Sequence, residues 1–178
     1  CKYISSSFYD SRLKSHPVTR ERSLSLDLKE IKNEGIFYLP VDHQDCTQKS
    51  DDEAKIIKDY CLKILGKNYT EDRQKRKITI DDIMMVAPFN MQVNNLKKIL
   101  NKKEARIGTI DKFQGQESKV VFISMTSSDP ENLPRHKEFF FSRNRLNVAI
   151  SRAQCVAVIL FNPKLLLADC KSINEIRL

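Results

Sequence analysis

One polar segment of the chain, residues 109–117 (TIDKFQGQE), holds residue types that could contact a nucleotide. Glycine lets a backbone approach a ligand closely, and Gln114 and Glu117 offer a neutral and an anionic group for hydroxyls. A turn between two strands, with Phe113 buried as its anchor, explains the same composition. This segment alone leaves both interpretations open.

A second segment, residues 143–153 (RNRLNVAISRA), carries three arginines on an expected helix. The planar guanidinium group binds phosphate oxygens in a bidentate manner, so this pattern could hold a phosphate. Surface ion pairs are the alternative, and composition does not separate the two.

The glycines exclude two common phosphate-binding loops. The chain contains four of them, at positions 35, 66, 108 and 115. In the Gly66-Lys67 pair, Asn68 follows and Cys61 occupies the position where a Walker A loop needs glycine. No two glycines stand two residues apart, so the dinucleotide fingerprint G-x-G-x-x-G is also excluded. The chain has no P-loop of its own.

Cysteine and histidine do not form a metal-binding pattern. The cysteines are at positions 1, 46, 61, 155 and 170, and the histidines at 16, 43 and 136. This odd set of cysteines has no Cys-x-x-Cys pair and fits neither a zinc framework nor a disulfide framework. We therefore expect reduced, mostly buried thiols and no metal site.

The net charge of +8, from 31 Lys+Arg and 23 Asp+Glu, favours polyanionic partners. Residues 67–77 (KNYTEDRQKRK) carry part of this charge, and we interpret them as an exposed connection rather than a nucleic-acid patch. No apolar run reaches the roughly 20 residues that span a bilayer, so we expect no membrane contact and a cytoplasmic location.

Residues 109–117 and 143–153 lie between apolar runs. These runs predict strands near 36–39, 83–87, 106–109, 119–125 and 155–161. Helical patterns alternate with these runs. One helix begins at Ser50, which forms a capping box with Glu53, and a terminal helix opens at Asn162-Pro163. The alternation predicts an α/β fold with a mostly parallel sheet and helices on both faces.

In such sheets ligands bind beyond the carboxyl ends of the strands, so we expect the site in the loops after Ala87, Gly108 and Ser124. Residues 1–33 are polar and are interpreted as an irregular entry segment, and residues 34–178 as a single domain. Cys1 in place of an initiator methionine favours a fragment of a larger protein.

Residues 108–117 (GTIDKFQGQE) resemble motif V of superfamily 1 helicases of the Upf1-like and Dna2-like group, and residues 145–153 (RLNVAISRA) resemble motif VI. Both motifs belong to the second, C-terminal RecA-like domain of that family. Residues 88–92 (PFNMQ) are similar to the family's Pro-Tyr-x-x-Gln element, and residues 8–13 (FYDSRL) to the segment leading into this domain. The resemblance implies a RecA-like P-loop NTPase fold that lacks its own P-loop.

The resemblance also implies residue roles. Arg152 is the catalytic arginine that reaches the γ-phosphate across an interdomain cleft. The ATP-binding residues are Gln114, Gly115, Glu117 and Arg152. The nucleic-acid-binding residues are Thr109, Phe89, Gln92, Ser127 and Asn147, of which Ser127 and Asn147 could instead line the cleft. Phe89 and Gln92 are equally explained as a packed turn and a helix-capping amide. Gln116 stands where some relatives carry arginine, and Ser151 where threonine is commoner.

The function implied is the C-terminal motor domain of an ATP-dependent 5′ to 3′ helicase acting on DNA or RNA. Its cofactors are ATP and Mg²⁺, bound mainly by a first RecA-like domain that these 178 residues do not include, so the isolated chain should be inactive. Expected partners are that domain and single-stranded nucleic acid. Two alternatives stay open: a non-catalytic nucleic-acid-binding module and a protein-interaction module. Arg152 and Glu117, which a pure binder does not need, favour the helicase.

Overall fold

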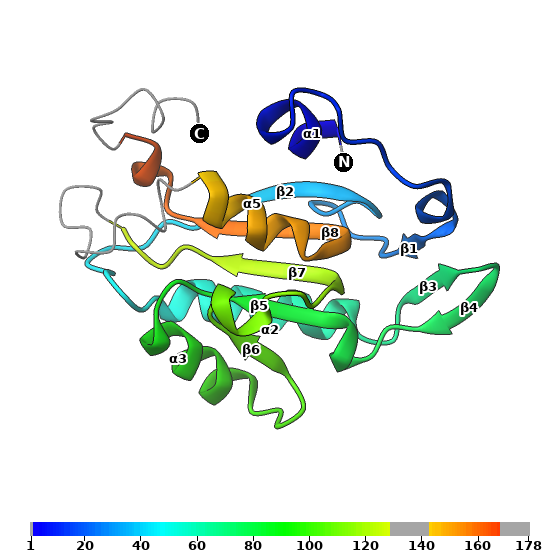
Figure 1. The fold of residues 1–178 in the computed structure, drawn as a ribbon. Coiled ribbons are helices and arrows are strands. Elements are labelled where there is room, and N and C mark those ends of the chain that lie inside the picture. The colour runs from blue at the N-terminus through cyan, green and yellow to red at the C-terminus, as the bar shows by residue number, and fades with distance from the viewer. Residues whose placement is uncertain (1, 129–142, 168–178) are drawn as a thin grey trace.

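A computed structural model describes residues 2–128 and 143–167, arranged around a five-stranded parallel sheet (Figure 1). The strand order is β2 (Gly35–Pro40), β8 (Ala153–Phe161), β7 (Ser118–Ser124), β5 (Ile83–Val86) and β6 (Arg106–Gly108). Every neighbouring pair in this order is parallel. The predicted α/β class and the five predicted strands are confirmed.

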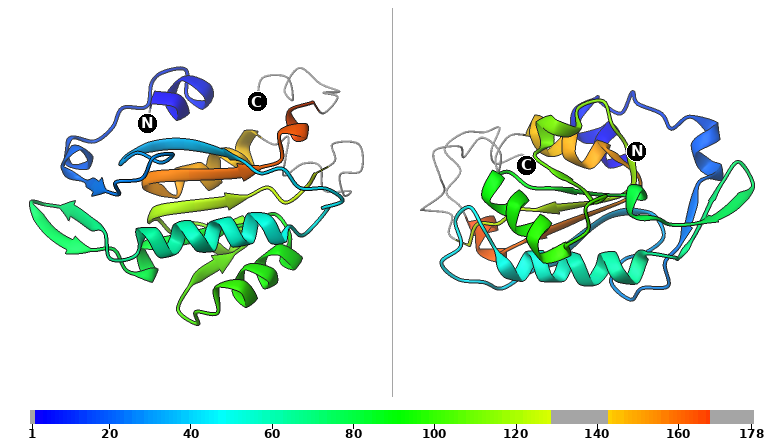
Figure 2. Two further views of the ribbon diagram at one scale, coloured as in Figure 1. Left: turned by 180° about the vertical axis from the view of Figure 1, so that it is seen from behind. Right: turned by 90° about the horizontal axis from the view of Figure 1, so that it is seen from below.

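Helices cover both faces of the sheet (Figure 2). One face carries α2 (Asp51–Ile64) and α3 (Asn90–Leu100), and the other carries α5 (Arg143–Ser151) and the 3₁₀ turn η3 (Ile110–Phe113). In β5, Ile83 and Met85 pack toward the first face, while Met84 and Val86 pack toward the second. Because both faces are covered, the central strands are continuous apolar runs.

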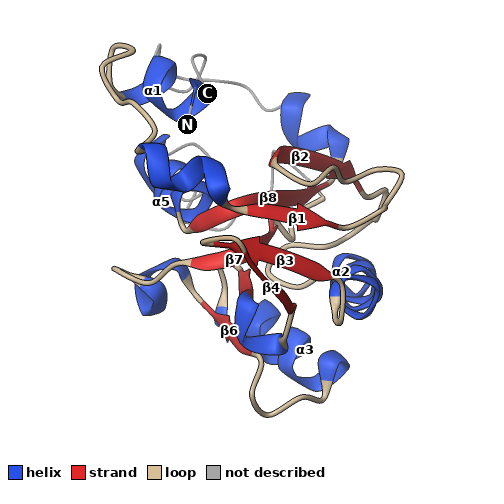
Figure 3. Cartoon of the chain, turned by 90° about the vertical axis from the view of Figure 1, so that its right-hand side faces the viewer, coloured by secondary structure: helices blue, strands red, loops and turns tan. Residues whose placement is uncertain are grey.

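Residues 67–77 are mostly exposed, as predicted, but they form a β-hairpin rather than an irregular connection. β3 (Asn68–Glu71) pairs antiparallel with β4 (Gln74–Lys77), and the short β1 (Ser23–Ser25) adds a third strand beside β3. The ring of Tyr69 is fully buried, with the charged groups of Arg76 and Lys119 at 5.0 and 4.6 Å from its centroid. Figure 3 shows this small sheet near the ends where the parallel strands begin.

Residues 1–33 are also more regular than expected. α1 (Lys2–Phe8) packs against α5, the 3₁₀ turn η1 (Pro17–Glu21) follows, and β1 pairs with β3. Arg22 forms an ion pair with Glu71 of β3 at 2.8 Å. These contacts join residues far apart in the sequence, which explains why local patterns did not predict them.

The chain after β8 begins a new helical turn, η4 (Pro163–Leu167), where the side-chain oxygen of Asn162 accepts the Lys164 N–H at 2.9 Å. The rest of the predicted terminal helix lies outside the described residues. Within the described part of the chain, no helix is long and apolar enough to cross a lipid bilayer.

Candidate functional site

The residues singled out from the sequence divide between the two ends of the parallel sheet. Thr109 directly follows β6, whose last residue Gly108 is level with Val86 at the carboxyl end of β5. The chain then crosses one face of the sheet through η3 and enters β7 at Ser118. Residues 114–117 therefore lie at the amino ends of the strands, because parallel strands are joined by such crossovers. The expectation of one site beyond the carboxyl ends was wrong for these residues.

The amino ends of β7 and β8 bring the motif V and motif VI segments (residues 108–117 and 145–153) into contact. Arg152 Nη1 donates to the main-chain oxygen of Gln116 at 3.4 Å. The Ser118 N–H donates to the main-chain oxygen of Arg152 at 2.9 Å, so the backbone fixes the same junction. Gln114, one of the predicted ATP-binding residues, is exposed beside it.

Gly115 turns the chain into this junction. Its φ of 76° is in the left-handed region, which favours glycine. A Cβ built at Gly115 would meet no atom within 4 Å, in contrast to Gly108, where a Cβ would stand 2.6 Å from Lys112 Cδ. The backbone of Gly115 is therefore open to a ligand, while Gly108 allows η3 to fold back against β6.

Arg152 rests against the last turn of its own helix. Its Nε donates to the Val148 main-chain oxygen at 3.1 Å, and its Nη2 donates to Ser151 Oγ at 3.3 Å. Unpaired carbonyls give a helix C-terminus partial negative charge, so a cation is favourable there. Ser151, like the threonine that is commoner at this position, has a hydroxyl group, and this hydroxyl is one of the acceptors that hold the guanidinium of Arg152.

The donor set at this end suits a nucleotide better than a metal ion. The guanidinium of Arg152 can pair with phosphate, and the exposed carboxyl group of Glu117, which accepts from Gln154 Nε2 at 2.9 Å, can accept from hydroxyls. Mg²⁺ prefers several oxygen ligands in octahedral geometry. Residues 2–128 and 143–167 contain no group of three His, Cys, Asp or Glu side chains that could hold a metal.

At the carboxyl ends of the strands, Thr109 is the half-buried N-cap residue of η3. Phe89 is 8% exposed and belongs to the apolar cluster that includes Phe113 and Ile110. Ser127 is fully buried. Both side chains are largely covered, so little of either is presented at the surface to a nucleic-acid strand.

Gln92 holds the N-cap residue of α2 in place through its side-chain amide, which is close to the helix-capping role that the sequence left open. It is fully buried, accepts the Ser50 N–H at 3.0 Å and donates to the Ser50 oxygen at 2.9 Å. Ser50 in turn caps α2 by accepting the Glu53 N–H at 3.2 Å. Only this half of the predicted capping box forms, because the Glu53 side chain is directed elsewhere. Asn147 on α5 is half-buried, and its Oδ1 has no hydrogen-bond partner among the described residues.

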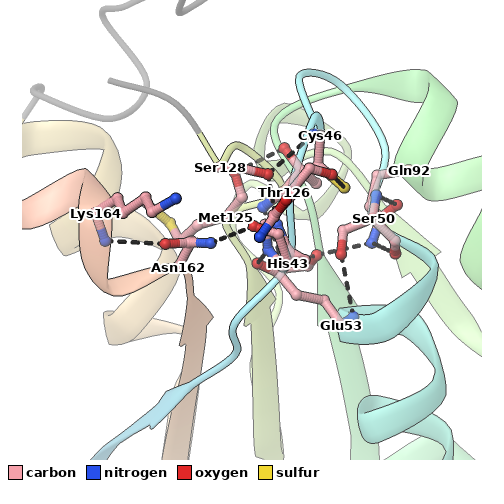
Figure 4. Close-up of polar contacts among 12 residues, drawn as sticks. His43, Cys46, Ser50, Glu53, Gln92, Met125, Thr126, Ser128, Asn162 and Lys164 are labelled. Carbon is pink, nitrogen blue, oxygen red and sulfur yellow. Dashed lines mark hydrogen bonds and ion pairs between the residues drawn. The ribbon is translucent and has the colours of Figure 1, made fainter. Parts of the chain in front are cut away.

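Sequence reasoning missed a buried polar network at the carboxyl ends of the strands (Figure 4). Glu53, fully buried at the start of α2, places Oε1 3.0 Å from His43 Nε2. Its Oε2 accepts from Ser124 Oγ at 2.5 Å and from the Thr126 N–H at 3.0 Å. His43 Nδ1 lies 2.7 Å from Ser128 Oγ. This network joins the loop after β2, the start of α2 and the segment after β7.

The order Ser128, His43, Glu53 resembles a hydrolytic triad, but its surroundings favour a structural role. Ser128 is only 4% exposed, and its Oγ also accepts the Cys46 N–H at 2.9 Å. Thr126 has a φ of 66°, an unusual value for a β-branched residue. The network therefore holds a strained turn after β7. The capping-box pattern at Glu53 was its one local signal in the sequence.

The cysteines that the structure describes, Cys46, Cys61 and Cys155, are free thiols. Burial raises the pKa of Cys61 to about 11, and burial likewise raises that of Cys155 to about 11. Both thiols are protonated at neutral pH, which makes them poor nucleophiles.

Comparisons with known proteins agree with this architecture. A protein-family model described as "AAA domain" matches residues 1–164. RNA helicase Mov10l1 of Mus musculus is 30% identical over 123 residues, covering 66% of this chain and 10% of that protein. The DNA polymerase alpha-associated DNA helicase A of Schizosaccharomyces pombe is 27% identical over 163 residues, covering 85% of this chain and 24% of that protein.

This chain thus corresponds to a quarter or less of either relative's length. The family match extends from α1 through β8, and so includes both the entry segment and the junction of Gln116 with Arg152. The chain belongs to this AAA-domain family and is a superfamily 1 helicase domain of the Upf1-like group with a RecA-like fold.

Proposed function

We propose that the chain is the C-terminal motor domain of an ATP-dependent superfamily 1 helicase. In this proposal it supplies the motif V and motif VI segments to an ATP site completed by a first RecA-like domain. The observation that carries the proposal is the contact of Arg152 with Gln116 beside the open backbone of Gly115. Residues 34–178 form the motor domain, and residues 1–33 lead into it.

At the amino ends of the strands, Arg152 leaves the last turn of α5 and pairs with the γ-phosphate. Gln114 and the Gly115 backbone contact the nucleotide, and Glu117 accepts from the ribose hydroxyls. ATP would supply the phosphoryl group, and a Mg²⁺ ion bound mainly by the first domain would supply charge neutralisation there. Arg152 stabilises the negative charge that develops on the phosphoryl group in the transition state, because its guanidinium carries a permanent positive charge.

At the carboxyl ends, Thr109 contacts the backbone of a single strand of DNA or RNA. Asn147, in the middle of α5, contacts the nucleic acid or lines the cleft between the two domains. The relatives include both an RNA helicase and a DNA helicase, so the proposal covers either nucleic acid. The nucleic acid and the nucleotide are thus placed at opposite ends of one sheet. The turn η3 lies between Thr109 and Gly115 and connects the two ends along the chain.

The isolated chain should hydrolyse no ATP above background. It contains no Walker A loop to hold the β- and γ-phosphates. A phosphate-release assay, with and without single-stranded nucleic acid, measures the rate of ATP hydrolysis. As a positive control, the first domain is produced separately and added, and ATP hydrolysis should then appear. ATP hydrolysis by the isolated chain alone would contradict the proposal that the ATP site is shared between two domains.

The isolated chain should bind single strands weakly and with little sequence preference, because phosphate contacts dominate such binding. With about three to four phosphates contacted, log affinity should fall with log salt at a slope of about −2 to −3. Fluorescence anisotropy with homopolymers of DNA and RNA at several salt concentrations tests this. Absence of binding would favour the protein-interaction alternative.

A further inference from the structure

Arg106, the first residue of β6, forms a bridge that no helicase motif assigned above includes. Its Nη1 donates to the Glu117 main-chain oxygen at 3.0 Å and to the Asp81 main-chain oxygen at 3.1 Å. Its Nη2 donates to Gln116 Oε1 at 3.0 Å. One half-buried side chain therefore ties the end of the motif V segment to the 3₁₀ turn η2 (Ile80–Asp82), which follows the β3–β4 hairpin.

The Gln116-Glu117 dipeptide is held by two arginines. Arg106 donates hydrogen bonds to the side-chain oxygen of Gln116 and to the main-chain oxygen of Glu117. Arg152 donates to the main-chain oxygen of Gln116. The Gln116 N–H is also satisfied, donating to the Phe113 oxygen at 3.0 Å. The orientation of this dipeptide thus depends on Arg106 as well as on the local chain.

We propose that Arg106 is a positioning residue for the nucleotide end of the domain, an inference that rests on the proposed function. Arg106 fixes Gln116 and Glu117 so that the Glu117 carboxyl group and the Gly115 backbone present one geometry to the nucleotide. It acts through Gln116 and Glu117 rather than on the nucleotide itself. The exposed Gly115 turn, whose φ is 76°, depends on this support because nothing packs around the position of its missing Cβ.

Arginine suits this bridge better than lysine. The acceptors lie on three separate residues, and the planar guanidinium group reaches them with two nitrogen atoms in fixed directions. The Cζ atom of Arg106 also lies 5.9 Å from the centroid of the Phe113 ring, within reach of a cation–π contact. A lysine ammonium keeps the charge but presents a single nitrogen, so it should retain part of the bridge at most.

The test uses steady-state ATPase of the intact helicase, with saturating single strand, for the wild type, Arg106→Ala and Arg106→Lys. Arg106→Ala should raise KM for ATP by roughly five- to twentyfold, as expected for partly exposed hydrogen bonds to a charged group. The kcat should change less than KM, and the Kd for single strand should stay within about twofold of wild type. Arg106→Lys should recover only part of the loss.

Lys119→Ala is the matched control. Lys119, near the start of β7, forms an ion pair with Glu71 of the hairpin at 3.0 Å, and no hydrogen bond joins its side chain to Gln116 or Glu117. Its KM for ATP should stay close to wild type. An equal rise in the KM for ATP in Arg106→Ala and Lys119→Ala would mean that a general loss of structure at this end of the sheet is responsible, and it would overturn the inference. In the Gln116→Ala background, Arg106→Ala should have a smaller effect on KM, and fully additive effects contradict the bridge.

Arg152→Ala, measured in parallel, separates this inference from the proposed function. Loss of kcat in Arg152→Ala with an unchanged KM in Arg106→Ala defeats only the role of Arg106. Wild-type kinetics in both variants defeats the assignment of this end of the sheet to ATP.

Discussion

Replacing Arg152 by alanine should lower the kcat of the intact helicase by about two or more orders of magnitude at saturating ATP and single strand. A guanidinium that stabilises charge only in the transition state changes kcat rather than substrate binding. The Kd for single strand should stay near wild type, because Thr109 and Arg152 lie at opposite ends of the sheet.

Arg152→Lys should recover little of this activity. A lysine ammonium is a point charge and cannot reproduce the geometry of the guanidinium group. The stability of the fold is a necessary control. In the described structure Arg152 contacts its own helix and one exposed carbonyl, so Arg152→Ala should change the free energy of unfolding by about 1 kcal/mol or less.

Near-wild-type turnover of Arg152→Ala would mean that this arginine only stabilises the end of α5. The proposed ATP site would then be wrong, whatever the fold. Large loss of both turnover and stability would instead point to a packing role, which urea unfolding of the same variants can detect.

The sequence predicted the parallel sheet well because burial on both faces makes β5, β7 and β8 continuous apolar runs. It did not predict the β3–β4 hairpin, since β4 is exposed along its whole length and has no apolar residue. The residue that anchors this hairpin is Tyr69, whose contacts come from Arg76 within the hairpin and from Lys119 in β7. Such long-range contacts leave no periodic signal in a short segment.

The nucleotide end of the domain could be anticipated only through the resemblance of two segments to helicase motifs. Their contact depends on the register of β7 and β8, in which Ser118 is paired with Ala153. The bridge from Arg106 could not be anticipated, because two of its three acceptors are main-chain oxygens, which any residue type supplies. Gln92, which belongs to a segment similar to a family element, is instead buried and bonded to the main chain of the N-cap residue Ser50.

The buried network around Glu53 should make this residue one of the most sensitive positions in the fold. Glu53→Ala should lower the free energy of unfolding by about 3–5 kcal/mol, because it leaves His43 and the Thr126 N–H without their partner in a buried site. The turn at Thr126, with φ at 66°, also loses the hydrogen bond that holds it.

Glu53→Gln should cost less, about 1–2 kcal/mol, because its amide oxygen can still accept from Thr126 while its NH₂ group faces His43. Glu71→Gln is the matched control: Glu71 is also paired, with Arg22 and Lys119, but its side chain is 29% exposed. That change should stay within about 1 kcal/mol of wild type. Urea unfolding of the three variants measures these differences. A loss in Glu53→Ala no larger than in Glu71→Gln would mean that the segment after β7 is held by packing alone, and that the Thr126 backbone does not depend on the carboxyl group of Glu53.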